Sequence, residues 1–262
     1  MDIDELRTRV NTFFRSQDIV TDRPGWWRTP LLVTAGADQR FDILPRIAAD
    51  THWLPRDLLA SCRTVVVFFI PFSDRLSDGN INGKFASDDW GRSLSLTNTL
   101  IQSVSEFIRD EFLGRGYASA LTPATYNFDP VSLTARWSHK HLAHLSGLGR
   151  FGMNAQLITP LGCAGRIGSL VTEAPMGDHP LVTEKELCLH KAGRDCRECI
   201  RSCPVQAVTR SGIDRHRCNA RLQVNRKRFA ARPGMADDIE VCAKCVAGMP
   251  CSLTSPVPPL AG

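Results

Sequence analysis

Apolar residues recur along this chain with different periods, and each period predicts a different kind of element. Residues 4–14 and 94–112 place apolar side chains three and four positions apart, which is the spacing of one face of an α-helix. Residues 54–60 and 132–146 are two further predicted helices, and Gly147 ends the second of them. Residues 94–112 form the longest predicted helix.

Continuous apolar runs predict the strands. Residues 64–71 (TVVVFFIP) are a β-branched and aromatic run, which is typical of a strand buried on both faces of a sheet that helices cover. Residues 117–121, 156–159 and 166–172 are the other predicted strands. Between strand and helix, the polar residues 74–91 are expected to form a mobile surface loop of the kind that often covers a ligand.

Length and composition limit the number of domains and the cellular location of the protein. A chain of 262 residues allows one large domain, or one medium and one small domain. The longest apolar run, residues 65–71, is far too short to cross a membrane. Residues 1–7 are charged and lack the apolar stretch of a secretory signal. We therefore expect a cytoplasmic protein with no membrane partner.

The net charge of +5 is concentrated near the C-terminus, where residues 191–232 contain twelve Lys or Arg and three Asp or Glu. One interpretation is a solvated basic face beside anionic groups. Another is a docking face for an acidic electron donor such as reduced ferredoxin or flavodoxin. A nucleic-acid interface is disfavoured, because Phe229 is the only aromatic residue among the basic ones.

Cysteines supply the clearest chemical pattern. Eight of the ten cysteines lie within the 64 residues 188–251. Cys196, Cys199 and Cys203, followed by Pro204, form the spacing C-x2-C-x3-C-P, which resembles the run that binds [4Fe–4S] clusters in bacterial ferredoxins. Eight thiolates are the number that two such clusters need.

Disulfides and structural zinc are the alternative roles of these cysteines. Disulfides require an oxidising compartment, to which nothing in the sequence points. Two zinc sites would also use eight thiolates. The small and apolar residues Val205, Ala207 and Val208 after the C-x3-C-P run favour iron–sulfur clusters over zinc.

The ligands can be assigned by analogy with two-cluster ferredoxins, in which the cysteine before the proline reaches across to the other cluster. One cluster should be held by Cys188, Cys196, Cys199 and Cys251, and the other by Cys203, Cys218, Cys242 and Cys245. Seven residues separate Cys188 from Cys196, and five separate Cys245 from Cys251, which makes both loops longer than in ferredoxins. Because of these longer loops, the assignment of Cys188 and Cys251 as ligands is undecided, and His190 is an alternative to Cys188.

A second constellation, residues 137–172, precedes the cysteines and is dense in glycine. Glycine between a helix and strands lets the backbone approach a neighbouring group closely. Tight turn packing would explain any single glycine. A whole glycine block directly before an iron–sulfur module favours a cofactor instead.

This block resembles the corresponding part of the epoxyqueuosine reductases and is similar to a block in the reductive dehalogenases. The resemblance rests on Ser146-Gly-Leu-Gly149, on the run from Gly152 to Gly162, and on the cysteine half with Cys218 behind Asp214-Arg-His-Arg. It covers about residues 60–255. The positions that it implies for cofactor binding are Gly147, Gly149, Gly152, Asn154 and Gly162.

The resemblance implies a two-part reductase. Residues 1–182 would form an α/β (α+β) nitroreductase-like domain that holds a corrinoid (cobalamin) and the substrate. Residues 183–255 would form a small bacterial-ferredoxin-like domain with two [4Fe–4S] clusters, and residues 256–262 a proline-rich tail. Electrons would pass from a reduced donor through the clusters to the corrinoid, which reduces a small molecule.

Two positions depart from the epoxyqueuosine reductase pattern. Leu133 stands where those enzymes have an acidic proton donor, and Met153 replaces a lysine. The helical-repeat tail of the tRNA-acting members is absent before the chain ends at Gly262. We therefore expect a small-molecule substrate and not tRNA.

Few residues qualify for proton transfer. Tyr117 and Tyr126 are the only tyrosines, and a phenol is the donor type of the dehalogenases that the chain resembles. Tyr126, in the loop before the glycine-block helix, is the predicted catalytic residue, and a half-buried structural role is the alternative. His141 and His144 lie three positions apart, which suits a metal pair, a proton relay or ordinary packing.

The two remaining cysteines are expected to differ. Cys62, just before the buried strand, should be a buried apolar residue. Cys163 lies in the turn of the glycine block and is a candidate functional thiol. Two functions without a bound corrinoid stay open: an electron-transfer protein for a partner enzyme, and a reductive activase for an oxidised cobalamin on another protein.

Overall fold

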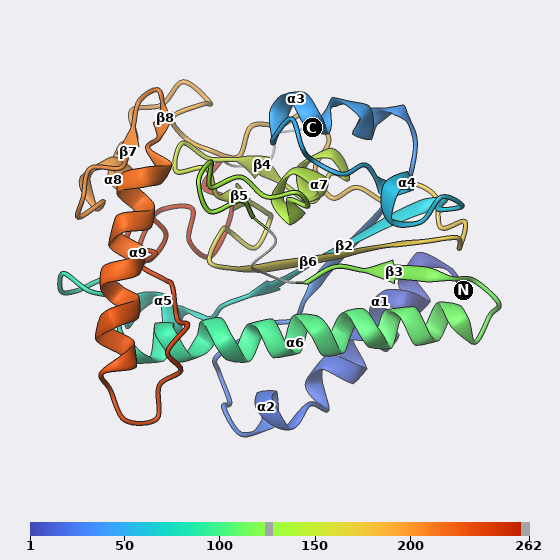
Figure 1. The fold of residues 1–262 in the computed structure, drawn as a ribbon, viewed down its shortest axis with the longest axis horizontal. Helices are drawn as coiled ribbons and strands as arrows, with labels where there is room; N and C mark the ends of the chain where they lie inside the picture. The colour runs from blue at the N-terminus through green and yellow to red at the C-terminus, as the bar shows by residue number, and fades with distance from the viewer. Residues whose placement is uncertain (124–127, 258–262) are drawn as a thin grey trace.

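The structure, a computed structural model, describes residues 1–123 and 128–257. Its centre is a four-stranded sheet of order β1-β2-β6-β3, in which each strand is antiparallel to its neighbours (Figure 1). The strands are β1 (Leu31–Gly36), β2 (Thr64–Pro71), β6 (Gly165–Thr172) and β3 (Ser119–Leu121). The strand predicted over residues 64–71 is confirmed with its bounds, and so is a mixed α/β fold built around a sheet.

Helices cover both faces of the sheet, which is why every residue of β2 is buried. On one face Val66, Phe68 and Ile70 pack with residues of α1 (Ile3–Arg15) and α6 (Asp88–Leu113). The alternate side chains of β2 pack on the other face with η1 (Gln39–Ile43), α3 (Leu44–Ile47), α4 (Pro55–Leu58) and α7 (His139–Leu145). The two-residue period of a strand thus divides one apolar run between two cores.

The helices predicted over residues 4–14 and 94–112 are both confirmed. Helix α1 contains residues 4–14 and begins at an N-cap, Asp2, whose carboxylate accepts the Glu5 N–H at 2.8 Å. Helix α6 contains residues 94–112 but starts six residues earlier, at Asp88, where the Ser87 side chain caps it. A short helix, α2 (Asp18–Thr21), follows α1.

The helix predicted over residues 132–146 is wrong in its first half, because only α7 forms. The carboxylate of Asp129 accepts the backbone N–H groups of Val131 and Ser132, and Leu133 has a φ of 55°. This turn directs the chain away from a helical path before α7 begins at His139.

The polar segment 74–91 is not the free surface loop that its composition predicts. It forms α5 (Asp74–Asp78), and Asn80 behind that helix is fully buried. The Asn80 amide donates to the Cys242 carbonyl at 3.0 Å, and the Lys244 ammonium donates to the carbonyls of Asn80 and Asn82 at 2.7 Å each. The polar residues therefore connect the sheet domain to the cysteine-rich segment.

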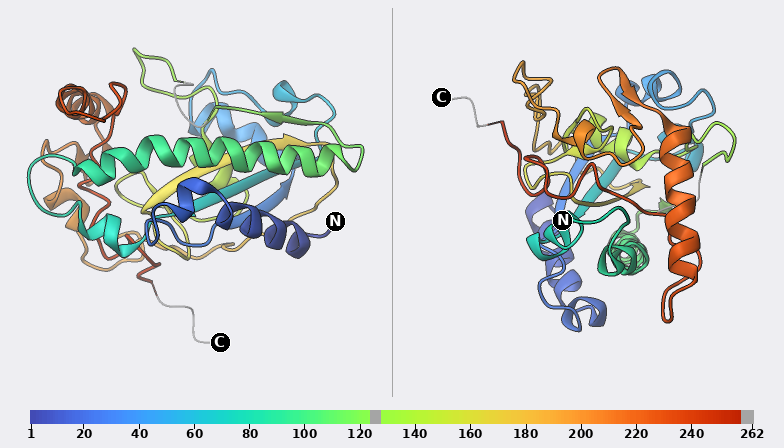
Figure 2. Two further views of the ribbon diagram at one scale, coloured as in Figure 1. Left: turned by 90° about the horizontal axis from the view of Figure 1, so that it is seen from below. Right: turned by 90° about the vertical axis from the view of Figure 1, so that its left-hand side faces the viewer.

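The cysteine-rich part has short elements and one long helix. It contains α8 (Glu198–Arg201), a hairpin of β7 (Val208–Thr209) and β8 (Gly212–Ile213), and α9 (Arg215–Ala230) at one side of the molecule (Figure 2). A second small sheet, β4 (Arg150–Phe151) with β5 (Leu157–Ile158), lies in the glycine block. None of the described helices is long and apolar enough to cross a membrane.

The cysteine-rich part shares a core with the sheet domain. Leu187, Cys188, Val246 and Ala247 belong to the same buried cluster as the apolar faces of α1 and α6. The division of the chain near residue 182 stays a prediction, since no break in the packing marks it.

Gly168 of β6 offers a test of this packing. A Cβ at Gly168 would lie 2.3 Å from the Phe68 ring and 2.8 Å from the Ile101 side chain. Gly168→Ala should lower the free energy of unfolding by about 1–3 kcal/mol, which is the range for overpacked cores. Urea denaturation would measure it, with Gly36→Ala as the control, because the nearest atom there is 3.6 Å away. Equal stability of the two variants would contradict this account.

Candidate metal centre and adjoining cavity

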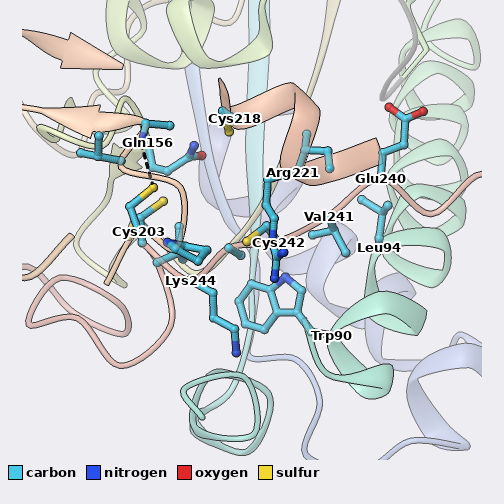
Figure 3. A pocket seen from close by; sticks show the side chains of 18 of the residues that line it. Trp90, Leu94, Gln156, Cys203, Cys218, Arg221, Glu240, Val241, Cys242 and Lys244 are labelled. Carbon is cyan, nitrogen blue, oxygen red and sulfur yellow. Dashed lines mark hydrogen bonds between the residues drawn. The ribbon is translucent and has the colours of Figure 1, made fainter. Parts of the chain in front are cut away.

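The eight C-terminal cysteines line two separate cavities, four to each. We call Cys188, Cys196, Cys199 and Cys251 the first cysteine group; they line a narrow cavity of about 20 Å³. We call Cys203, Cys218, Cys242 and Cys245 the second cysteine group; they line a cavity of about 230 Å³ (Figure 3). The structure thus brings together the two sets that the spacing predicts, with Cys188 and Cys251 in the first.

Burial and mutual proximity raise the pKa of one cysteine of the first group, Cys199, and of two of the second, Cys218 and Cys245, whereas the hydrogen bond from Cys163 lowers that of Cys251. Burial, followed by the neighbouring charges of the other three members of its group, raises the pKa of Cys199 to about 11. Burial also raises the pKa of Cys218, with Cys242 and Cys203 acting in the same direction. None of the ten cysteines forms a disulfide, and in the described part of the chain no three His, Cys, Asp or Glu side chains are spaced to ligate a single ion.

Backbone hydrogen bonds fix the loop that carries Cys251. The N–H groups of Cys163 and Ala164 donate to the carbonyls of Cys251 and Ser252 at 2.9 and 2.8 Å. Gly162, with a φ of +80°, lies so close that a Cβ there would be 2.2 Å from the Ser252 oxygen. A side chain at position 162 would therefore displace the loop that completes the first cysteine group.

The glycine block makes its closest contacts with protein atoms. A Cβ at Gly147 would meet Pro180 at 2.4 Å, and one at Gly149 would meet the Ile158 oxygen at 2.2 Å. Asn154 is buried and its amide donates to the Cys245 carbonyl at 2.7 Å. Gly152 lines the large cavity described next. Whether these residues bind a cofactor stays a prediction.

A large cavity of about 1010 Å³, the wide cavity, adjoins the second cysteine group. Cys218 lies in the walls of both, and Met153 and His190 separate the wide cavity from the first cysteine group. A side cavity of about 440 Å³ shares several wall residues with it, including Leu133. The basic residues on the wide cavity are Lys140, Arg166, Lys191, Arg210 and Arg215, and the acidic ones are Glu186 and Glu240.

Lys140 is a wall residue of both cavities that sequence reasoning missed. Its ammonium donates to the Ala155 carbonyl at 3.0 Å. Burial lowers its pKa and the charge of Arg215 lowers it further, whereas Cys218 and Cys245 raise it. The only signal in the sequence is a lysine between two histidines at the start of the glycine-block helix.

The histidines of α7 have different surroundings. His139 is buried: Trp137 Nε1 donates to Ser169 Oγ, that hydroxyl lies 2.7 Å from His139 Nδ1, and His139 Nε2 lies 3.0 Å from the Pro123 carbonyl. With Nε2 donating and Nδ1 accepting, the ring is neutral, and burial lowers the pKa of His139 to about 4. His139 is therefore a satisfied core histidine.

His141 and His144 both contact the ring of Phe151, with centroid distances of 4.9 and 5.4 Å. Burial lowers the pKa of His141 to about 4, and its Nδ1 lies 2.7 Å from Ser138 Oγ. His141 also lines the wide and side cavities, whereas Nδ1 of His144 lies 3.3 Å from the Gly149 carbonyl oxygen. Ordinary packing therefore accounts for His144, whereas His141 lies on the wall of the wide and side cavities.

The other predicted candidates lie apart from one another. Tyr126 lies outside the described residues, and Tyr117 is half-buried against the core on the α1 side of the sheet. Cys62 is half-buried before β2, and burial raises its pKa. Cys163 is buried and its sulfur lies 3.9 Å from that of Cys251.

Comparison with proteins of known structure places this fold. Comparisons with protein families and with curated proteins found no match. Among solved structures, the chain is similar to a selenomethionine-labelled epoxyqueuosine reductase, at 15% identity and a TM-score of 0.57, covering 96% of this chain and 66% of that one. The epoxyqueuosine reductase of Streptococcus thermophilus matches at 16% identity and a TM-score of 0.57, covering 98% and 69%. The reductive dehalogenase NpRdhA with 3-bromo-4-hydroxybenzoic acid matches at 14% identity and 0.56, covering 86% and 30%.

These similar structures show that the chain has a fold found in two kinds of reductase. The predicted resemblance to epoxyqueuosine reductases and reductive dehalogenases is confirmed at the level of the fold. The chain spans just under two thirds of the first epoxyqueuosine reductase. Another matched structure is an epoxyqueuosine reductase with a modified tRNA-Tyr stem loop, at 15% identity and a TM-score of 0.57. Our expectation of a small-molecule substrate and not tRNA stays a prediction.

Because His139 is buried in its neutral form, the free energy of unfolding should depend on pH. Its pKa of about 4 lies below the ordinary histidine value of 6.5, so the histidine contributes stability above pH 6.5 that is lost as the pH falls toward 4. Unfolding free energy should therefore fall over this interval, and less steeply in His139→Gln. Urea denaturation at several pH values would measure both slopes, with His216→Gln on the exposed face of α9 as the control. Parallel slopes for wild type and His139→Gln would refute the assignment.

Proposed function

We propose that this chain is an iron–sulfur oxidoreductase that carries two [4Fe–4S] clusters and uses a corrinoid to reduce its substrate. The observation that carries the proposal is the division of eight thiols into two groups of four around two cavities, one of which shares wall residues with the wide cavity. When bound, the clusters would supply single electrons and the corrinoid a reducing cobalt centre. A reduced ferredoxin or flavodoxin is the proposed electron donor.

The residues of both groups fit the proposed clusters. Four thiolates are the usual ligand set of a [4Fe–4S] cluster, and a cationic iron core would offset the repulsion and burial that raise the pKa values of Cys199 and Cys218. The Ala207 N–H donates to the sulfur of Cys203 at 3.1 Å, which stabilises a negatively charged ligand. Cys188 and Cys242 are buried, and the other six cysteines of the two groups are half-buried.

The wide cavity fits a large cofactor together with a substrate. At about 1010 Å³ it is at the upper end of the volumes that small-molecule sites have. Apolar walls from Leu94, Phe151 and Met153 would contact the corrin face, while Gln156 and Arg215 could bind its polar substituents. Because Cys218 is a wall residue, the proposed second cluster would lie directly beside this cofactor.

Two substrate classes are supported by different observations. The size of the side cavity favours a small molecule next to Lys140 and His141. The five basic residues on the wide cavity, and the tRNA stem loop bound by a protein of the same fold, favour an anionic substrate such as modified RNA. Electron transfer to a partner enzyme without a corrinoid is the alternative if neither substrate class is reduced.

Metal analysis tests the clusters. Anaerobically purified protein should contain about eight irons per chain and absorb broadly near 400 nm. Cys199→Ser and Cys218→Ser should each lose about half of the iron, because each removes a ligand of a different cluster. Cys62→Ser, outside both groups, is the matched control and should keep all of it. Zinc in place of iron, or full iron in both ligand variants, would refute the assignment.

Hydroxocobalamin titration under a low-potential reductant tests the corrinoid. Binding with a change in the visible spectrum is the expected result, and no binding to protein that holds about eight irons would favour the electron-transfer alternative. An epoxyqueuosine-modified tRNA stem loop and 3-bromo-4-hydroxybenzoic acid are suitable first substrates, since proteins of this fold are known with them.

Lys140 is our candidate for delivering the proton at Nζ. On a substrate that the protein reduces, Lys140→Met should lower kcat by about 100-fold or more, which is a typical effect of losing a general acid. The pKa of Lys140 is lowered, so the wild-type rate should fall as the pH rises through that lowered pKa. Lys140→Arg keeps the charge and should show no such fall. An unchanged rate in Lys140→Met would rule out this role.

A further inference from the structure

Cys163 belongs to neither cysteine group, yet it lies between them. Its sulfur is 3.9 Å from the sulfur of Cys251 in the first group. On its other side it lines the cavity of the second group, beside Cys245. The side chain is buried, with 5% of its surface exposed.

The backbone holds Cys163 in this position. Its N–H donates to the Cys251 carbonyl at 2.9 Å, and the next residue, Ala164, donates to the Ser252 carbonyl. The turn before Cys163 is closed by hydrogen bonds in both directions between Thr159 and Gly162. The approach of the two sulfur atoms thus follows from paired backbone segments and not from a freely rotating loop.

Only one of the two sulfurs can donate a hydrogen bond once a cluster is present. A thiol must lose its proton to bind a metal, so Cys251 as a ligand is an acceptor. Cys163, which lies outside both sets of four, keeps its S–H group. The geometry then leaves an S–H donor directed at a ligand sulfur.

We propose that Cys163 donates an S–H hydrogen bond to Cys251 and thereby raises the reduction potential of the cluster held by the first cysteine group. The proposal rests on the two clusters of the proposed function. Hydrogen bonds to cluster sulfurs help to set the potential of such clusters, because they stabilise the reduced state, which carries one more negative charge. The one electron needed for reduction would come from the reductant, and Cys163 would retain its proton.

The test is a redox titration with dithionite, followed by electron paramagnetic resonance, on wild type, Cys163→Ala, Cys163→Ser and Cys62→Ala. In Cys163→Ala the first-group cluster should be harder to reduce, with a ratio of reduced to oxidised cluster about tenfold lower at a fixed potential, equivalent to about 59 mV for one electron. Cys163→Ser keeps a donor and should lie close to wild type. Cys62→Ala removes a thiol remote from both groups and should match wild type.

Iron content separates the possible failures. A Cys163→Ala protein with about eight irons and an unchanged potential would overturn the proposal while the proposed function stands. Loss of about four irons in both Cys163 variants would make Cys163 a ligand, which also overturns it. Wild-type protein without clusters would overturn the proposed function and this inference together. If Cys163→Ala does not fold, a wild-type potential in Cys163→Val would equally refute the hydrogen bond.

Discussion

Burial of many thiols side by side is the constraint on which the rest of this structure depends. A thiolate that loses its water is destabilised, and a second thiolate beside it destabilises it further. Both effects raise the pKa of Cys199 and Cys218. Under the proposed function, iron shared among the four members of a group would offset both effects, and the chain would have to gather those four sulfurs from distant positions.

The sheet domain gathers them through a few long polar side chains. The cysteine-rich loops have little regular structure, so their carbonyls need partners from elsewhere. The guanidinium of Arg28 donates to the carbonyls of Phe72, Leu161 and Leu253. Asn80 and Asn154 donate to Cys242 and Cys245. A buried carbonyl left without a donor costs about 1–3 kcal/mol, so these side chains determine where the cysteine loops lie.

The same contacts explain which features the sequence could predict. The strand over residues 64–71 and helix α6 follow from local periodicity, and the predicted cysteine groups follow from the likeness of their spacing to that of two-cluster ferredoxins. The helical state of α9 does not, because only Asn225 and Phe229 are buried along its 16 residues, so its apolar pattern is too weak to detect. Asn80 resembles a loop residue in the sequence, because its partner Cys242 lies 162 positions further along the chain. The glycines predicted a close approach correctly, but the approaching atoms belong to residues such as Ser252 and Ile158, which no local pattern identifies.

Charge links the second cysteine group to the cavity beside it. Opposing effects act on the pKa of Lys140. Burial and the charge of Arg215 lower it, whereas Cys218 and Cys245 raise it. Under the proposed function, each electron that reaches the second group makes its surroundings more negative and favours the protonated ammonium. Opposite charges stabilise one another most strongly where water is excluded. The arrival of an electron and the availability of a proton would then be coupled on one cavity wall, through a lysine that neither the cysteine spacing nor the glycine block identifies.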